Sequence, residues 1–588
     1  MKHKKQNYIL GVTGLSHAFH DNSAVLLKNG KVIFAASEER YSRIKHDRSF
    51  PIRAIKHALN FANIKPKDIS YLTVGYPKRY FFTPFLESPF DFFKTFLGWI
   101  RGRKLRFLSD CANIVKGEFL QNTNRALGGT DFADVKIVNV DHHLAHAASA
   151  YYTSGFNKCL AVSMDAFGPK NNGKLISGAV FSCNSGKIVP VEEISIDSSI
   201  GLFYTAITQA LEFTPGDGEG KTMGLAAYGN SKLAYKKLKE ISPYFQNGNW
   251  HKSPMWMEMF FANRKEFRPI FNVLPIGIFL ADVISKYGKE NVAAAAQLIL
   301  EEECVEYFAF LQKKYKVHLF ALSGGVFLNV KMNQRIIDIS GIEDIFVHPN
   351  AGDGGTALGS ALWVYGERYG FKSLPSRIDN IAWGSEYSHK EILKVLKHFG
   401  KHVAYRYYKN IAKVVAQKLV AGVVVGWYQG RFEWGPRALG FRSVLIDPRR
   451  MDIKDKLNNT LKNREWFMPF APSVMDEYGK EYFVKYKSSP FMTLAFNVRR
   501  RKVLDIKAAI HVDKTARPNS VTSQNNAKYY ALIKEFYKIT KIPVVLNTSF
   551  NKHGLPIVNS PEDAVRHLLW NCIDQLAIGN FLVKKREL

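Results

Sequence analysis

The sequence predicts an α/β protein with two domains, the first of them internally duplicated. Three observations predict this class: a three-strand pattern that occurs twice, about 150 residues apart, glycine-rich turns after two later strands, and a final stretch in which helices and strands alternate without a repeat. A chain of 588 residues has room for two to four domains of roughly 150 residues each. Its 46% hydrophobic residues exclude wholesale disorder.

The first copy of the pattern occupies the first forty residues. We expect strands at residues 8–14, 23–28 and 31–37. Asn29-Gly30 separates the last two and favours a hairpin, because both residues tolerate positive φ. The turn between the first two strands contains His20 and Asp21. These side chains would meet a phosphate or substrate group, or they serve as ordinary turn residues.

The second copy predicts strands at residues 159–163, 174–183 and 187–194, with Asp165 after the first of them. This duplicated architecture is the one used by actin, the sugar kinases and the heat-shock chaperone ATPases. In it, the turns of each half hold nucleotide phosphates and a metal between two lobes. We therefore predict an actin-like ATPase fold for residues 1–370.

Two glycine-rich turns follow later strands of this domain. Strand 319–322 leads into Ser323-Gly324-Gly325 and a helix over 326–334, and strand 345–348 leads into a turn at 350–355 and a helix from Thr356. Small residues let backbone N–H groups approach an anion. The expected nucleotide-binding residues here are Gly324, Gly325, Asn329, Gly352 and Gly354.

A second, α+β domain is expected at residues 386–588, after a linker at 371–385. Helices are predicted at 391–399 and 411–421, and strands at 423–428, 443–447, 492–498 and 542–547. Between the two copies of the first domain lies an aromatic-rich segment, 80–108. It predicts an inserted helical hairpin, with a membrane-surface helix as the alternative because basic residues follow it.

The charge is strongly positive and uneven. Of the formal +31, residues 371–588 contribute +20 and residues 1–370 contribute +11. Such an excess suggests nucleic acid, an anionic membrane or phosphorylated small substrates as partners. The five scattered cysteines lack a C-x-x-C pair and argue against a disulfide framework or a cysteine-ligated zinc. The longest apolar stretch, 273–284, is too short to span a membrane, and we expect a cytoplasmic protein.

A candidate metal site begins at residue 142. His142 and His146 are four residues apart, so on a helix they project from one face. Asp165 and Asp353 follow strands whose ends this fold would bring to the same cleft. Two histidines and two carboxylates suit a divalent transition metal such as iron, manganese or zinc. The alternative is a histidine-capped helix without a metal.

Two further groups of residues are candidates for anion chemistry. The glycine-rich loop 213–229 is not a Walker A motif, but Lys221 could hold a phosphate and Asp217 or Glu219 could act as a general base. These charges are otherwise solvated loop residues. In the second domain, basic and polar residues beside turns predict a preformed anion pocket, with a solvated basic face as the alternative. These residues are Arg437, Lys462, Arg517, Asn547 and Ser549.

Long motifs carry a resemblance along nearly the whole chain. They include ILGVTGLSHAFHDNSAVLL, HHLAHAASA, GDGEGKTMGLAAYG, LSGGVFLN, NAGDGGTALG, GRFEWGPRALGFRS, MPFAPS and VLNTSFN. The chain resembles the O-carbamoyltransferase family that includes nodulation proteins and the cephamycin, tobramycin and ansamycin carbamoyltransferases. The resemblance implies a first domain like the tRNA threonylcarbamoyl-transferring proteins and a YrdC-like second domain.

The resemblance also implies a mechanism. The second domain would take carbamoyl phosphate and ATP and form carbamoyl-adenylate, and the first would transfer the carbamoyl group to an acceptor hydroxyl with a bound metal, iron(II). By motif, His142, His146, Asp165 and Asp353 match the metal ligands. The five anion-pocket residues of the second domain match the carbamoyl-phosphate and adenylate site. His20, Asp21 and Asp217 are the candidates for the base that the acceptor hydroxyl needs.

Two positions depart from the family pattern. Met468 stands where the family commonly has arginine, and Lys514 replaces a glycine three residues before Arg517, which is kept. The acceptor stays open: a natural product, a sugar-like molecule or another hydroxyl compound. The alternative function is a tRNA-modifying or nucleic-acid-binding protein, but no RNA-reading motif is present and a nucleic-acid partner is disfavoured. A sugar kinase would not explain the basic second domain, and a homo-oligomer stays compatible with the sequence.

Overall fold

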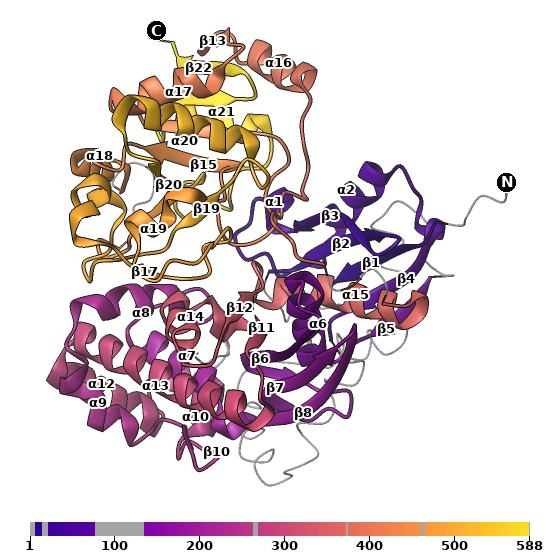
Figure 1. The fold of residues 1–588 in the computed structure, drawn as a ribbon, viewed down its shortest axis with the longest axis vertical. Coiled ribbons are helices and arrows are strands. Elements are labelled where there is room, and N and C mark those ends of the chain that lie inside the picture. Colours follow the sequence, from indigo (N-terminus) through magenta and orange to yellow (C-terminus); the bar gives the residue numbers. More distant parts are fainter. Residues whose placement is uncertain are drawn as a thin grey trace.

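The computed structural model describes residues 6–13, 21–76, 135–262, 268–371, 374, 376–458, 461 and 465–586. Figure 1 shows three parts: an indigo lobe, a magenta lobe below it, and an orange-to-yellow C-terminal domain above. The predicted aromatic-rich insertion at 80–108 lies outside the described residues. Within them, no helix is long and apolar enough to cross a membrane.

The first lobe is built on a five-stranded sheet. Its strands follow the order β3-β2-β1-β4-β5, in which β3, β2 and β1 are antiparallel neighbours and β1, β4 and β5 are parallel. The helices α1 (Glu39–Ser42) and α2 (Ile52–Ala62) follow β3. The bounds of the strands are Tyr8–Val12 (β1), Ser23–Lys28 (β2), Lys31–Ser37 (β3), Ile69–Val74 (β4) and Lys136–Asn139 (β5).

The second lobe repeats this sheet. Its order is β8-β7-β6-β11-β12, again with three antiparallel strands followed by two parallel pairings. The match of order and direction confirms the predicted duplication and the α/β class. The bounds of the strands are Lys158–Pro169 (β6), Leu175–Asn184 (β7), Lys187–Ser195 (β8), Leu319–Ser323 (β11) and Asp344–Val347 (β12).

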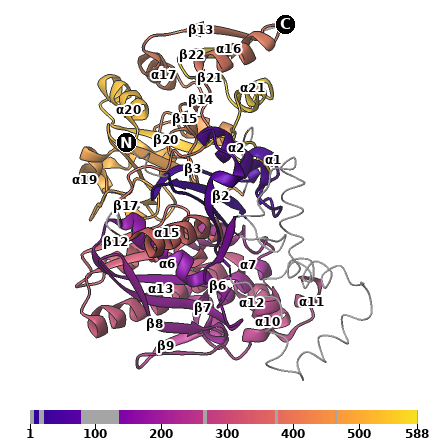
Figure 2. The ribbon, with the colours of Figure 1, turned by 90° about the vertical axis from the view of Figure 1, so that its right-hand side faces the viewer.

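Two helices lie between the sheets, as Figure 2 shows: α6 (His142–Ser154) and α15 (Thr356–Tyr369). They cross closely because Gly359 has no side chain. A Cβ atom there would lie 1.7 Å from the carbonyl oxygen of Ala145. Each helix follows the fifth strand of its own sheet, so the two occupy equivalent positions in the two copies.

A helical layer covers the second lobe around the long helix α13 (Lys289–Tyr315), which contacts five other helices of this layer. Its buried face includes a run of alanines that allows close packing. The contacting helices are α7 (Ile200–Ala210), α8 (Glu219–Leu225), α9 (Ser231–Lys239), α12 (Pro275–Tyr287) and α14 (Val330–Ile337). Further elements are β9 (Tyr244–Gln246), β10 (Asn249–His251), α10 (Trp256–Ala262) and α11 (Arg268–Phe271).

The C-terminal domain has a mixed eight-stranded sheet in the order β13-β22-β21-β14-β15-β20-β16-β19. The strands are β13 (Val403–Tyr407), β14 (Val425–Tyr428), β15 (Arg442–Ile446), β16 (Ala471–Met475), β19 (Asn519–Val521), β20 (Val544–Ser549), β21 (Gln575–Ile578) and β22 (Phe581–Lys585). The helices are α16 (His389–His398), α17 (Ile411–Val420), α18 (Met451–Leu457), α19 (Gly479–Tyr482), α20 (Ala527–Thr540) and α21 (Pro561–Leu569).

Two predicted elements differ from the structure. The strand expected at 492–498 is reduced to β17 (Phe496–Asn497), which pairs with β18 (Thr515–Ala516), because Met492 has a φ of 57° and breaks the extended backbone. The helix expected at 326–334 is interrupted at Asn329. There a 3-10 turn ends and α14 begins, since the Asn329 side chain accepts a hydrogen bond from the N–H of Met332.

Candidate functional site

The two histidines predicted as a pair lie at the start of α6. His142 and His146 are both fully buried, and their rings meet edge to face with centroids 4.6 Å apart. Gly168 makes room for the first ring, because a Cβ atom at that position would lie 2.0 Å from His142 Cδ2. The i, i+4 spacing therefore brings both imidazoles to one point.

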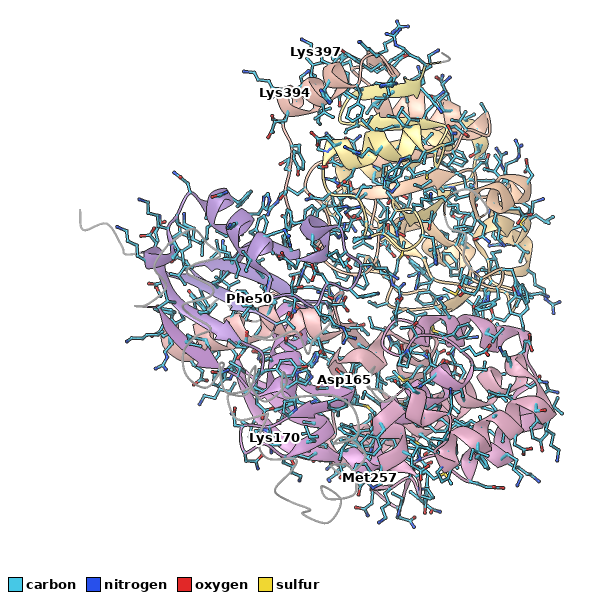
Figure 3. The ribbon with its side chains drawn as sticks, turned by 180° about the vertical axis from the view of Figure 1, so that it is seen from behind. Phe50, Asp165, Lys170, Met257, Lys394 and Lys397 are labelled. Atoms are coloured by element: carbon cyan, nitrogen blue, oxygen red, sulfur yellow. The ribbon has the colours of Figure 1, made fainter. Side chains whose placement is uncertain are left out.

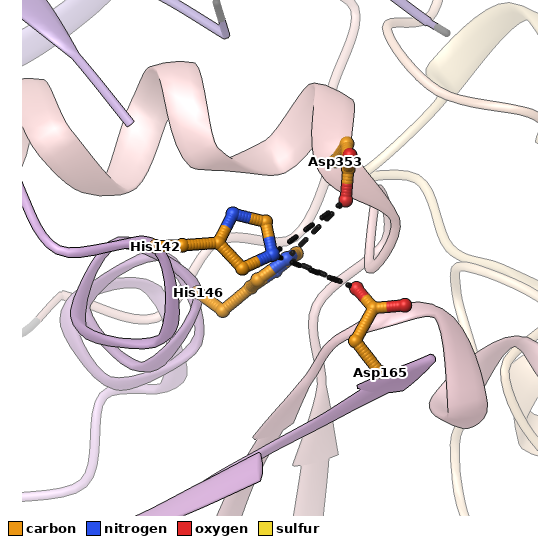
Figure 4. A group of neighbouring side chains, drawn as sticks. All are labelled: His142, His146, Asp165 and Asp353. Atoms are coloured by element: carbon orange, nitrogen blue, oxygen red, sulfur yellow. Dashed lines mark ion pairs between the residues drawn. The ribbon is translucent and has the colours of Figure 1, made fainter. Parts of the chain in front are cut away.

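Two carboxylates from the second lobe face the histidines (Figure 4). Asp165 lies in β6 and Asp353 begins the short turn after β12. His146 Nε2 lies 3.4 Å from Asp165 Oδ2 and 3.6 Å from Asp353 Oδ1, and His142 Nε2 lies 3.8 Å from each of the same two oxygens. One ligand atom from each of the four side chains lies within 4.8 Å of every other. We call these four residues the tetrad.

Several buried atoms of the tetrad have no hydrogen-bond partner in the described structure: both ring nitrogens of His142, Nε2 of His146 and Oδ2 of Asp165. Buried polar groups are nearly always paired in proteins. Two imidazole nitrogens and two carboxylate oxygens that converge in this way form a donor set that fits a divalent transition metal.

Neighbouring groups orient the tetrad. The Ser323 hydroxyl donates to the Ala351 carbonyl oxygen and lies 3.1 Å from His146 Nδ1, and this contact holds the ring with its Nε2 facing the carboxylates. Asp353 Oδ2 accepts a hydrogen bond of 2.8 Å from the Tyr76 hydroxyl. These bonds fix one ring and one carboxylate in place.

Electrostatics separate the histidines of this helix. Burial opposes protonation of His146, but Asp165 and Asp353 raise its pKa to about 9. Burial raises the pKa of Asp165, but the two histidines outweigh this effect and hold that pKa well below its usual range. His143 differs: burial and the neighbouring imidazoles lower its pKa to about 3, and its two nitrogens contact Ser163 Oγ and the Ile176 carbonyl. His143 is therefore a neutral core residue.

The glycines of the two turns surround these carboxylates. A Cβ atom on Gly325 would lie 2.9 Å from Asp165 Oδ1, and one on Gly324, where φ is 108°, would lie 2.1 Å from the Met164 carbonyl oxygen. A Cβ atom on Gly352 would instead meet mostly open space. Glycine at 324 and 325 thus permits the approach of Asp165. Nucleotide contacts by these glycines stay a prediction.

The Asn329 side chain is engaged within the protein. Its oxygen accepts from Met332 N and Gln297 Nε2, and its amide donates to Gln297 Oε1 at 2.8 Å. The amide thus caps α14 and links that helix to α13. Its predicted contact with a nucleotide is not tested by these bonds.

A second cluster joins two of the predicted base candidates through a histidine that the sequence interpretation missed. His46 Nδ1 lies 2.8 Å from Asp21 Oδ1, and His46 Nε2 lies 2.9 Å from Asp217 Oδ1. Lys45 also donates to Asp217, at 3.1 Å. These contacts span 25 and 171 residues, and no sequence spacing reports them.

The charges of this cluster are coupled. Burial opposes protonation, but hydrogen bonds to Asp21 and Asp217 raise the pKa of His46 to about 10. Burial likewise opposes ionisation of Asp217, but His46 and Lys45 hold its pKa well below the usual range. At neutral pH the cluster is an imidazolium between two carboxylates.

The His46 cluster and the tetrad are neighbours. Gly354 follows Asp353 directly, and a Cβ atom on it would lie 3.1 Å from the carbonyl oxygen of Asp21 and from Ser23 Oγ. The turn that holds a tetrad carboxylate therefore touches the turn that holds Asp21. The third base candidate, His20, lies outside the described residues.

Lys221 connects the two domains. Its Nζ donates to Glu465 Oε1 of the C-terminal domain at 2.7 Å. Around this pair, the rings of Tyr228 and Trp466 meet edge on, and a Cβ atom on Gly224 would lie 3.0 Å from Met468 Sδ. The methionine that departs from the family pattern thus packs at the domain contact. A phosphate contact by Lys221 stays a prediction.

Arg437 lies in the loop between β14 and β15. It is half-buried, burial lowers its pKa to about 10, and it forms no ion pair with any described residue. Asn547 in β20 supports the loop by donating to the Ala438 carbonyl oxygen at 3.0 Å, while its buried Oδ1 has no hydrogen-bond partner among the residues that the structure describes. An unpaired guanidinium on this loop and an unpaired amide oxygen on the strand that supports the loop fit an anion that also carries a hydrogen-bond donor.

Two of the other predicted pocket residues lie in β20 and after β18. Ser549 ends β20 and donates to Asn551 Oδ1 at 2.6 Å, and Arg517 follows β18 directly. Lys462 lies outside the described residues. Glu433, which was not predicted, is fully buried and accepts from the N–H groups of Leu439 and Arg442. It holds the Arg437 loop closed.

The Arg437 loop reaches the first domain. Trp434 Nε1 donates to Ser23 Oγ at 3.3 Å, and a Cβ atom on Gly435 would lie 3.4 Å from the Pro349 carbonyl oxygen. Ser23 adjoins the Asp21 turn, and Pro349 opens the turn that carries Asp353. The loop therefore borders both turns of the first-domain site. Figure 3 shows the labelled Asp165 where the three parts of the molecule meet.

Comparison with known proteins identifies carbamoyltransferase sequences along most of the chain. The Carbamoyltransferase N-terminus model matches residues 9–362, and the Carbamoyltransferase C-terminus model matches residues 416–585. Nodulation protein NolNO of Sinorhizobium fredii is 32% identical over 96% of this chain and 79% of its own length. The 3'-hydroxymethylcephem-O-carbamoyltransferase of Streptomyces clavuligerus is 28% identical over 61% of this chain and 64% of its own.

Likeness to solved structures is weak. Full-length HypF in its phosphate- and nucleotide-bound form is 15% identical, covers 62% of this chain and 57% of its own, and has a TM-score of 0.32. That score is too low to inform the fold or the function. The two matched models together span most of the sequence, and on that basis the chain is an enzyme that belongs to the carbamoyltransferase family.

Proposed function

We propose that the protein is an ATP-dependent O-carbamoyltransferase. It would form carbamoyl-adenylate from carbamoyl phosphate and ATP in a YrdC-like C-terminal domain. It would then transfer the carbamoyl group to a hydroxyl of a natural-product or sugar-like acceptor in an actin-like first domain. The observation that carries this proposal is the placement of the Arg437 loop against the turns of Asp21 and Asp353.

The first step needs a pocket for phosphorylated substrates. Arg437 offers an unpaired guanidinium, Asn547 an unpaired side-chain carbonyl oxygen and Ser549 a hydroxyl at the end of the strand that carries Asn547. In this step water cleaves carbamoyl phosphate into carbamate and inorganic phosphate, a carbamate oxygen then bonds to the α-phosphorus of ATP, and pyrophosphate leaves. Arginine at this point neutralises phosphate charge, and the enclosure protects carbamate, which decomposes readily in water.

The second step needs the acceptor hydroxyl beside the carbamoyl carbon. The acceptor oxygen bonds to that carbon, AMP leaves, and the hydroxyl proton passes to a nearby base. Asp217 is accessible to solvent and fixed by His46 and Lys45, so it can accept the hydroxyl hydrogen bond and orient the acceptor. The positive charge of His46 makes Asp217 a weak base, which fits a transfer of the hydroxyl proton after the acceptor oxygen has bonded to the carbamoyl carbon.

The tetrad would hold a divalent metal, iron(II) by the family resemblance. When bound, such an ion supplies a Lewis acid for phosphate or carbonyl oxygens. The protein's part is to present two imidazole nitrogens and two carboxylate oxygens in fixed directions. Ser323 and Tyr76 provide this orientation through their hydrogen bonds to His146 and Asp353.

The test separates the two steps. Purified full-length protein is incubated with carbamoyl phosphate and ATP, and carbamoyl-dependent pyrophosphate exchange reports the first step. Transfer of label from carbamoyl phosphate to a panel of hydroxyl compounds reports the second. Arg437→Ala should abolish both, whereas His142→Ala should keep exchange and lose transfer. Equal loss of exchange in His142→Ala would contradict the assignment of steps to domains.

A further inference from the structure

A cavity of about 340 Å³ lies at the junction of the first lobe and the C-terminal domain, and its lining includes no residue of the tetrad or of the Arg437 pocket. Its walls come from α1, from one face of α2 and from the start of α21. Four of the lining side chains are basic: Arg40, Arg43, Arg53 and Lys56. The acidic one is Asp563.

The charges of this cavity are only partly balanced. Arg43 Nε lies 3.4 Å from Asp563, and Arg53 pairs with Glu38 at 3.1 Å. Arg40 and Lys56 form no ion pair with any residue that the structure describes. The carboxylates of Glu433 and Glu39 act on Arg40 without forming an ion pair with it, and Lys56 has no counter-charge within ion-pair distance in the described structure.

Arg40 is the buried member of the set, with 2% of its surface exposed. Its Nη2 donates to the carbonyl oxygens of Glu433 and Gly435, so the Arg437 loop holds it in place. Its Nη1 is buried and has no hydrogen-bond partner in the described structure. A buried guanidinium N–H without an acceptor is costly, and an oxyanion is the partner that such a group selects.

Asn559 supplies the complementary feature. It is 5% exposed, and its Oδ1 is a buried acceptor without a hydrogen-bond partner in the described structure. The Asn559 backbone is fixed separately, because its carbonyl oxygen accepts from the Tyr428 hydroxyl at 2.6 Å. Two residues that line the cavity therefore carry a buried unpaired donor on a cation and a buried unpaired neutral acceptor. A ligand that pairs with both the Arg40 donor and the Asn559 acceptor carries an anionic group and a hydroxyl.

The remaining wall is aromatic and sets the size. Tyr41 and His57 stack with ring centroids 4.0 Å apart and planes 9° apart. A cavity of about 340 Å³ falls in the range of small organic ligands and leaves much space beside a single phosphate ion. We propose that this cavity binds a phosphorylated, hydroxyl-bearing small molecule of the sugar-phosphate class, held by Arg40 and Lys56 at the phosphoryl group and by Asn559 at a hydroxyl.

The site differs from the one in the proposed function, because none of its lining residues belongs to that machinery. It bridges two domains: Arg40 and Lys56 come from the first, and Asn559 from the second. A bound ligand would therefore hold α2 and α21 together.

Isothermal titration calorimetry of the full-length protein tests the proposal, with glucose 6-phosphate, glucose and inorganic phosphate as probes. We expect glucose 6-phosphate to bind and glucose not to bind. Inorganic phosphate should bind at least tenfold more weakly than the sugar phosphate; equal affinity of these two would overturn the sugar-phosphate class.

Variants locate the site. Lys56→Glu reverses an exposed charge at the cavity, and Asn559→Asp keeps the side-chain shape while repelling an anion; each should weaken glucose 6-phosphate binding at least tenfold. Lys67→Glu makes the same charge change on an exposed residue outside the cavity and should alter binding less than twofold. Unchanged binding in both cavity variants, or loss of binding in Arg437→Ala alone, would overturn the proposal.

Discussion

Lys221 in α8 and Glu465 in the C-terminal domain form a 2.7 Å ion pair, and both side chains are about one-quarter exposed. The pair joins the glycine-rich loop that carries Asp217 to the segment that leads into Met468. Its place at the domain contact gives Lys221 a structural task, distinct from the phosphate contact that its sequence context suggests.

A double-mutant cycle on Lys221→Met and Glu465→Gln separates these two tasks. A partly exposed pair contributes little, so the coupling free energy from urea unfolding should be below about 1 kcal/mol. If the ion pair with Glu465 is the main role of Lys221, both single variants should lower carbamoyl transfer to a similar extent. A loss confined to Lys221→Met would instead indicate that this lysine holds a substrate phosphate.

The His46 cluster makes stability depend on pH. The pKa of His46 is raised to about 10 in the folded protein, above its ordinary value of 6.5. Its stabilising contribution is therefore complete below about pH 6.5 and is lost as the pH rises to about 10. The difference in unfolding free energy between wild type and His46→Gln should be on the order of 1 kcal/mol at pH 6 and should shrink toward pH 10.

Urea unfolding at pH 6, 8 and 10 measures this trend. His398→Gln, at an exposed position on α16, provides the matched control and should show no comparable trend. A wild-type advantage over His46→Gln that stayed constant across this range would contradict the charged bridge between Asp21 and Asp217.

The tetrad predicts metal-dependent stability. Added iron(II), manganese(II) or zinc(II) should raise the melting temperature of the wild type, because a ligand at one hundred times its Kd stabilises the folded state by about 2.7 kcal/mol. Asp353→Asn and His146→Gln should lose most of this shift and most of the bound metal. Differential scanning fluorimetry and elemental analysis measure both quantities.

His143→Gln serves as the comparison for metal content, since both nitrogens of His143 contact Ser163 and Ile176 rather than the tetrad. Folded His143→Gln protein should retain the metal. Retention of metal by Asp353→Asn together with its loss in His143→Gln would show that the ligand set is wrong.

Gly359→Ala tests how the histidines are positioned. The added Cβ would lie 1.7 Å from the Ala145 carbonyl oxygen and would push α15 away from α6. We expect a loss of about 2–3 kcal/mol in unfolding free energy and weaker metal binding. Gly220→Ala, where an added Cβ meets no atom within 4 Å, should be neutral or stabilise α8 by about 0.5–1 kcal/mol. Equal effects of the two substitutions would contradict this account.

The features that could be predicted from the sequence are those that depend on the spacing of residues within a short segment. The i, i+4 histidines and the repeated hairpins are visible in short windows, and the structure places them in α6 and in two matching sheets. Asp353 could be added because the fold predicts where strand ends meet. Asp165 was expected after a strand at 159–163, but β6 continues to Pro169 and Asp165 lies where its register with β7 shifts, between Met164 and Gly168. The strand expected at 492–498 failed because the left-handed backbone of Met492 has no strong local signal.

Contacts between distant segments could not be predicted in this way. His46 meets Asp217 across 171 residues, and Arg40 reaches Glu433 across 393. Glu433 itself is surrounded by more conspicuous arginines, yet it closes the loop that bears Arg437. Nor did composition indicate where individual positive charges lie: Lys394 and Lys397 project from α16 at the outer end of the C-terminal domain (Figure 3).

The duplication has a mechanical consequence. The first copy, which ends with α6, supplies both nitrogens of the tetrad, and the second copy supplies both oxygens. Neither copy alone carries more than half of the coordination sphere. A cation bound there would cross-link the two copies reversibly. Any hinge motion that separates the lobes would therefore have to move the two imidazoles away from the two carboxylates. Occupancy of the centre and the width of the lobe opening are thereby expected to vary together.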